Sequence, residues 1–191
     1  MKMERLIIYL SVFIFYFNSY GLSFKVPSPD DLNPFSFHKK NTELKYKPLS
    51  DDVKEYIKHV FLQNDVLQEV ALQKAEILNN IAYYKFSDTE EDKNIAVHTA
   101  YNFAKIDTCL DAVSFKYLGY SKETIFLLQT LNKNLKMLIL DKPEKIKNYA
   151  KFNGLLNSLI IDIPVATGEN YGQIIDKYCP EEIRKKIKWK R

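Results

Sequence analysis

Two aspartates and a cysteine stand close together in the middle of the chain. Asp107 and Asp111 are four residues apart and flank Cys109. In a helix this spacing places both carboxyl groups on one face, one turn apart. Paired carboxyl groups can act as general acid and base or as metal ligands. The alternative, which we adopt, is a solvated face on which cations such as Lys105 or Lys116 neutralise the two charges.

The other residue types that carry chemistry do not form a recognisable constellation. His38, His59 and His98 are too scattered to match the spacing of zinc ligands. A nucleophilic Cys109 would need a neighbouring histidine, but His98 lies about 16 Å away along a straight helix. The segment Gly168–Gly172 has neither the preceding strand nor the pattern of a nucleotide-binding loop. We therefore predict no catalytic, cofactor-binding or metal site.

Cys109 and Cys179 are the two cysteines of the chain and lie 70 residues apart. An even, small number of cysteines in an exported protein is compatible with one disulfide. Such a bond would join the middle of the third helical segment to the start of the last one. Two unrelated buried thiols are the alternative, because spacing alone does not fix geometry.

The end of the chain is basic. Between Glu181 and Arg191, two acidic residues accompany six basic ones, so this tail carries the whole formal net charge of +4. The cations could simply offset the negative end of a last helix dipole. They could also, with Trp189, contact an anionic membrane surface or an acidic protein. A nucleic-acid partner is not expected, because the rest of the chain is neutral. The candidate contact residues are Arg184, Lys185, Lys186, Lys188, Trp189, Lys190 and Arg191.

The beginning of the chain has the layout of a secretory signal peptide. Lys2 and Arg5 precede the apolar run Leu6–Phe17, and small or polar residues follow it. We assign residues 1–21 to this peptide, with cleavage after Gly21 or after Ser23. A retained membrane anchor is the alternative, although spanning a bilayer takes about 20 apolar residues.

Helix-capping residues and the spacing of apolar residues indicate how the rest of the chain is organised. Residues 22–49 hold four prolines and predict an extended arm; a second targeting sequence is a further possibility for it. Residues 50–191 predict the helical domain. Apolar stripes at helical spacing predict one or two helices over 51–85, then helices over 87–118, 121–139, 141–164 and 170–178 and one from 180. Ser87 with Glu90, and Asp65, are expected caps.

The expected fold is all-α, a five- or six-helix bundle behind a signal peptide and a proline-containing arm. The expected role is non-catalytic: an exported protein, secreted or in a periplasmic or luminal space, that binds a protein partner. An inhibitor or an accessory subunit of an envelope complex would fit, with a tyrosine-bearing helical face or the basic tail as contact surface. A peripheral membrane protein, and an enzyme using Asp107 and Asp111, are the alternatives.

Overall fold

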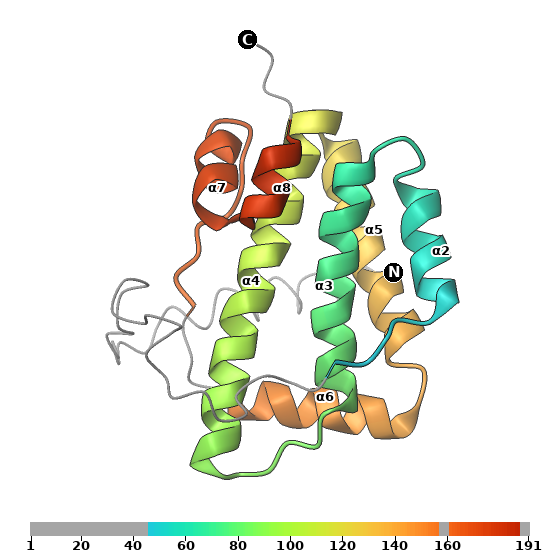
Figure 1. Cartoon of the computed structure of the whole chain (residues 1–191), viewed down its shortest axis with the longest axis vertical. Helices are drawn as coiled ribbons and strands as arrows, with labels where there is room; N and C mark the ends of the chain where they lie inside the picture. Colours follow the sequence, from blue (N-terminus) through green and yellow to red (C-terminus); the bar gives the residue numbers. More distant parts are fainter. Residues whose placement is uncertain (1–45, 157–160, 188–191) are drawn as a thin grey trace, which may run out of the picture. The chain divides into compact units, whose positions relative to one another are not determined.

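The computed structural model describes residues 46–156 and 161–187, which form seven α-helices and no strand (Figure 1). The expected all-α class is therefore confirmed. The signal peptide and most of the arm lie outside the described residues. The helices are α2 (Asp51–Val60), α3 (Asp65–Tyr83), α4 (Glu90–Leu118), α5 (Lys122–Ile139), α6 (Pro143–Leu155), α7 (Tyr171–Tyr178) and α8 (Glu181–Lys186).

The segment 51–85 is two helices rather than one. The break falls at Phe61–Asn64, where the side chain of Asn64 accepts a hydrogen bond of 2.9 Å from the backbone of Leu67. Asn64 is thus the cap of α3, and Asp65, the expected cap, is its first residue. The Gln68 side chain donates to the carbonyl of Phe61 at 2.8 Å and closes the turn.

The capping residue of α4 differs from the sequence prediction. Thr89, and not Ser87, accepts the hydrogen bond of the first turn, and Asp92 takes the place expected for Glu90. The reason is that the Asp92 carboxylate is buried and reaches back to the Ser87 backbone at 2.6 Å and to the Tyr84 hydroxyl at 2.7 Å. At the far end of α4, Gly119 has a positive φ of 85°, which glycine adopts without steric cost.

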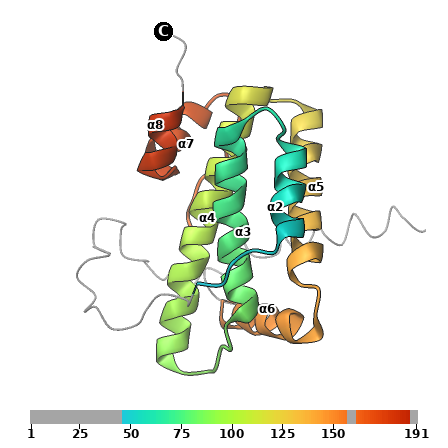
Figure 2. The same ribbon diagram turned by 45° about the vertical axis from the view of Figure 1, so that its right-hand side comes forward.

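The long helices α3 and α4 form the centre of the bundle. In Figures 1 and 2, α2 and α5 lie on one side of this pair, α7 and α8 lie on the other, and α6 crosses the lower end. The main core is built from the inward faces of α2 to α5 and of the two C-terminal helices. A smaller cluster forms where α6 crosses, and it contains Ile81, Phe86, Ile95, Ala96, Ala100 and Phe152.

The fifth predicted helix is shorter than expected. The prediction carried it to about residue 164, but α6 ends at Leu155, and residues 161–170 form an irregular connection. The residue before Pro164 is biased towards an extended backbone, which opposes a helix there. The turn that follows is held by Asn170, whose side chain accepts from the Thr167 backbone at 2.7 Å and donates to the Val165 carbonyl at 3.0 Å.

Candidate functional site

A cluster of charged and polar side chains lies between α3, α4 and α5. Lys74 of α3 donates hydrogen bonds to Asp107 of α4 and to the side-chain oxygen of Asn132 of α5. The lysine side chain is 4% exposed and that of Asp107 is 37% exposed, so the pair reaches from the core to the surface. The ammonium group also lies 5.7 Å from the centre of the Phe103 ring. Burial of such a charge is tolerated only where acceptors surround it.

Asp111 faces the same cluster from the next turn of α4. Burial and the negative charge of Asp107 together raise the pKa of Asp111 to about 7, although the positive charge of Lys74 opposes them in part. The ammonium group of Lys74 thus interacts with the carboxyl groups of both Asp107 and Asp111, and the Asp111 carboxyl group keeps its proton near neutral pH. A carboxyl group with such a pKa can donate or accept a proton at pH 7.

The interpretation of the two aspartates as a solvated, lysine-covered face is wrong in one respect. The cation paired with Asp107 is Lys74, which comes from another helix and is buried. Sequence reasoning missed Lys74, although it stands at a core position between Val70 and Leu78. A charged residue within an apolar stripe was the signal that could have found it. The described residues contain no group of three or more histidine, cysteine, aspartate or glutamate side chains placed to hold a metal ion.

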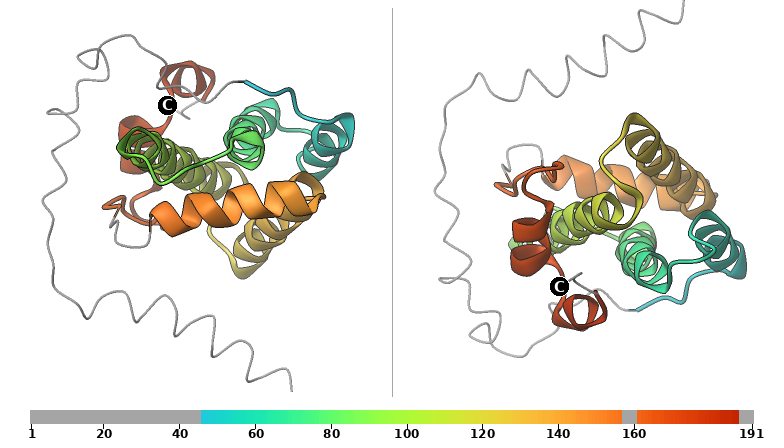
Figure 3. Two further views of the ribbon diagram at one scale, coloured as in Figure 1. Left: turned by 90° about the horizontal axis from the view of Figure 1, so that it is seen from below. Right: turned by 90° about the horizontal axis from the view of Figure 1, so that it is seen from above.

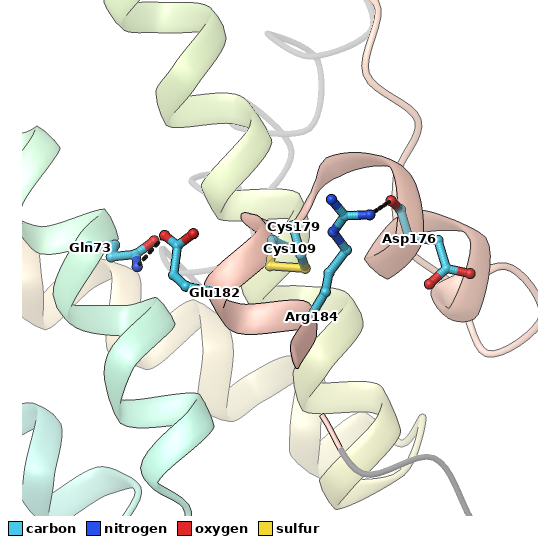
Figure 4. Close-up of a disulfide and its surroundings, with 6 residues drawn as sticks. All are labelled: Gln73, Cys109, Asp176, Cys179, Glu182 and Arg184. Carbon is cyan, nitrogen blue, oxygen red and sulfur yellow. Dashed lines mark hydrogen bonds between the residues drawn. A yellow bond between two sulfur atoms is a disulfide. The ribbon is translucent and has the colours of Figure 1, made fainter. Parts of the chain in front are cut away.

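Cys109 and Cys179 are bonded, as the sequence favoured, with a Cα–Cα distance of 5.0 Å. Both residues are buried. Cys109 lies in the second half of α4, and Cys179 lies between α7 and α8, so the bond ties the C-terminal helix pair to the central helix (Figure 4). Because Cys109 is in the disulfide, it is not a nucleophile in this state.

Polar contacts hold the two C-terminal helices in place around the disulfide. Glu182 of α8 accepts a hydrogen bond of 3.4 Å from Gln73 of α3, and Arg184 donates to the backbone carbonyl of Asp176 in α7 at 3.1 Å (Figure 4). Lys186 pairs with Glu69 of α3 at 2.5 Å.

The basic tail is described only in part. Arg184 and Lys186 make the contacts above, and Lys185 pairs with Glu181 at 2.7 Å. These three cations therefore anchor or stabilise α8. The remaining candidate residues, Lys188, Trp189, Lys190 and Arg191, lie outside the described residues, so a membrane or partner role for the tail stays a prediction.

Exposed apolar side chains occur on the end of α4, on the α4–α5 link and on the connection before α7, and this link and connection meet at Tyr120 and Gly168. Tyr120, in the link between α4 and α5, is 55% exposed, but its ring packs edge-on against Phe115 with centroids 4.8 Å apart. A Cβ atom on Gly168 would meet the Tyr120 side chain at 3.1 Å, so the connection before α7 supports the same ring. That connection also exposes 76% of Val165. We call Leu118, Tyr120 and Val165 the Tyr120 surface.

The tyrosine-rich rim expected from the sequence is largely packed. Among the described tyrosines, Tyr46, Tyr83 and Tyr120 are exposed, whereas Tyr178 is buried and the others are intermediate. The Tyr83 ring carries two ammonium groups, that of Lys145 at 4.6 Å and that of Lys47 at 5.9 Å from its centre. Tyr83 therefore lies near two cations, whereas Tyr120 is an exposed tyrosine that packs against Phe115.

A pocket of about 600 Å³ lies at the other end of the bundle, between α6 and the turn after α3. Its cations are partly neutralised, because Lys85 pairs with Glu144 at 3.4 Å and Lys151 pairs with Asp88 at 2.5 Å. It does not contain the Lys74 cluster. Its lining residues are Lys85, Phe86, Glu144, Lys147, Asn148 and Lys151.

None of the helices in residues 46–156 and 161–187 combines the length and the hydropathy needed to cross a bilayer. No family model, curated protein or solved structure matches the chain.

Proposed function

We propose that this chain is an exported, non-catalytic protein that binds a protein partner through the Tyr120 surface. The proposal rests on the environment of Tyr120. This residue is 55% exposed, yet its side chain already packs against Phe115 and Gly168. Large aromatic side chains dominate the binding energy of protein interfaces. An aromatic that is held before binding loses little conformational entropy when a partner covers it.

The disulfide supports the exported location. Disulfides persist in oxidising compartments and are rare in the cytosol of most cells. The Cys109–Cys179 bond is compatible with the extracellular location that the leader sequence predicts. It also bears on the Tyr120 surface, since it anchors α7, and the connection before α7 carries both Gly168 and Val165.

The Lys74 cluster supports a structural role more than a catalytic one. Catalysis by Asp111 would require access for a substrate. The neighbouring Lys74, however, already donates hydrogen bonds to Asp107 and Asn132, which come from two other helices. A buried, mutually bonded set of this kind positions helices relative to one another.

The proposal is tested by photo-cross-linking in the cells that make the protein. A photo-reactive amino acid replaces Leu118, which is exposed beside Tyr120, and the experiment is repeated in a Tyr120→Ala background. The matched control places the same group at Leu62, an exposed apolar residue in the turn between α2 and α3. We expect one defined adduct from position 118 that Tyr120→Ala removes and that position 62 does not form.

The opposite pattern would refute the proposal. If both positions give the same adducts, or if Tyr120→Ala leaves the adduct from position 118 unchanged, the Tyr120 surface is not a binding site. Circular dichroism and thermal melting of each variant verify that the fold is intact, since Tyr120 and Leu118 are exposed and their replacement costs little stability.

A further inference from the structure

The outer faces of α5 and α6 both expose lysines and apolar side chains. On α5, the exposed residues include three lysines and one acidic residue, Glu123. Figure 3 shows that α5 and α6 both lie on the side of the bundle away from α8. We call the following set the α5–α6 surface: Lys122, Phe126, Gln129, Lys133, Lys136 and Met137 on α5, with Ile146 and Lys147 on α6.

The apolar members of this surface are strongly exposed. Phe126 is 69% exposed, Met137 is 60% exposed and Ile146 is 53% exposed. Phe126 and Met137 are eleven residues apart, so they stand on one face of α5 with about 16 Å between them along the axis. Lys133 lies between the two on the same face. The opposite face of α5 is buried in the core through Leu128, Leu131, Leu135 and Ile139.

The lysines of this surface have few partners within the protein. Lys122, Lys133 and Lys147 make no hydrogen bond or ion pair with another described residue. Lys136 lies 5.7 Å from the centre of the Tyr149 ring and keeps its charge on the surface. These positive charges are thus directed at solvent or at a ligand.

The charge of the described residues is divided between two parts of the bundle. Residues 122–155 hold seven lysines and three acidic residues, a net charge of +4. The rest of the described residues hold twelve basic and seventeen acidic side chains, a net charge of −5. This separation produces a field that attracts an anionic partner to α5 and α6 and orients the protein towards it.

We infer that the α5–α6 surface docks on an anionic lipid membrane. Its composition suits a lipid surface, because the strongly exposed Phe126 and Met137 stand among lysines on one face of α5. Lysine stems can lie along the headgroups with their charges in water, and each contributes near an anionic surface. Phe126, Met137 and Ile146 then enter the boundary between headgroups and acyl chains. This docking is independent of the Tyr120 surface and goes beyond the proposed protein binding.

The test measures sedimentation of the full chain with vesicles of phosphatidylcholine containing about 30% phosphatidylserine, and with pure phosphatidylcholine. We expect binding to the anionic vesicles alone, with an affinity that falls as salt rises. The double variant Lys133→Glu with Lys147→Glu is expected to weaken binding at least about thirtyfold. The double variant Phe126→Ser with Met137→Ser is expected to weaken it about tenfold.

Two matched controls change the same residue types elsewhere. Lys54→Glu with Lys58→Glu alters the net charge equally on the exposed face of α2, and Leu62→Ser removes an apolar side chain that is 65% exposed. Both controls should retain binding within about threefold. All variants change exposed side chains, and melting curves check that they stay folded.

Three results would overturn the inference. One is absence of binding to the anionic vesicles. Another is binding that persists in both α5–α6 variants, which would assign the contact to the leader or the basic tail. The third is binding to soluble polyglutamate as tight as to vesicles and independent of Phe126 and Met137, which would point to an acidic protein surface.

Discussion

Lys74 and Asp107, which are 33 residues apart in the chain, form an ion pair that joins α3 to α4 in the interior of the bundle. Asn132 of α5 accepts a second hydrogen bond from the same ammonium group. A buried ammonium group is costly without its acceptors, so α3, α4 and α5 favour the one alignment in which Asp107 and Asn132 both face Lys74. The cluster thereby fixes how the three central helices pack.

Replacing Lys74 should therefore be costly. Lys74→Ala leaves two carboxyl groups without their cation and creates a void, and we expect the free energy of unfolding to fall by about 2–4 kcal/mol. Lys54→Ala is the matched control, because Lys54 pairs with Asp51 on an exposed face. There the expected change is within about 0.5 kcal/mol. Urea denaturation compares the two, and equal effects would show that the Lys74 pair contributes no more than a surface pair.

Asp111 should make stability depend on pH. Its pKa is about 7 in the folded state and 3.8 when unperturbed. The folded protein therefore holds a proton that the unfolded chain has released, and the free energy of unfolding falls as pH rises from about 4 to about 7. Above about pH 7, the folded protein bears the full cost of the buried, ionised Asp111. Asp111→Asn removes the charge and should stabilise the protein by about 1–3 kcal/mol at pH 8, but by little near pH 4.

Urea denaturation of both proteins at the two pH values measures this difference. A gain from Asp111→Asn that is the same at pH 4 and pH 8 would contradict a raised pKa. Asp176→Asn, at an exposed position of α7, controls for the general effect of removing one negative charge.

Loss of the disulfide should act first on the C-terminal helices. Cys109→Ala with Cys179→Ala opens a loop of 70 residues, and the chain-entropy model predicts a loss of about 4 kcal/mol. Because the bond anchors α7 and α8 to α4, hydrogen exchange should accelerate most in residues 171–186. Amides of α5 and α6 are the internal comparison, and a uniform acceleration along the chain would contradict a local clamp.

Gly168 should control the orientation of Tyr120. A Cβ atom at position 168 would approach the Tyr120 ring to 3.2 Å, so Gly168→Ala must displace the ring or the connection. We expect an altered near-ultraviolet circular dichroism spectrum and a lower cross-linking yield from position 118. Gly154→Ala is the control, since no atom lies within 4 Å of its added Cβ and alanine suits a helix better than glycine. Identical spectra for the two variants would show that Gly168 does not hold the ring.

Ser114 tests the opposite expectation, a substitution without cost. Its hydroxyl oxygen is buried and has no hydrogen-bond partner among the described residues. Removing an unsatisfied hydroxyl group relieves its desolvation penalty, so Ser114→Ala should leave the free energy of unfolding unchanged or raise it by up to about 1 kcal/mol. Chemical denaturation decides, and a loss greater than 1 kcal/mol would mean that the hydroxyl group is bonded in solution.

Local signals in the sequence sufficed for most helix boundaries. Ser121 caps α5, Gly119 ends α4 with a positive φ, and Pro143 begins α6, and these residues act on the backbone within one turn. The cap of α4 was missed because Asp92 outcompetes Glu90 through bonds to Ser87 and Tyr84 that depend on how the preceding turn folds back.

The residues of the candidate sites were harder to foresee, because their partners come from distant parts of the chain. The spacing of Asp107 and Asp111 predicted that they share a face, but only the packing of α3 on α4 brings Lys74 to them. Tyr120 was one of thirteen tyrosines in the sequence, and its distinction depends on the approach of Gly168 from 48 residues further on. The disulfide was foreseen because two cysteines allow one pairing.

The most direct test of an exported, disulfide-clamped binding protein is mass spectrometry of the native protein isolated from its producing cells without reductant. The account predicts an N-terminus at Leu22 or Phe24, a linked peptide containing Cys109 and Cys179, and recovery from outside the cytosol. A cytosolic protein that begins at Met1 and carries two free thiols would contradict it.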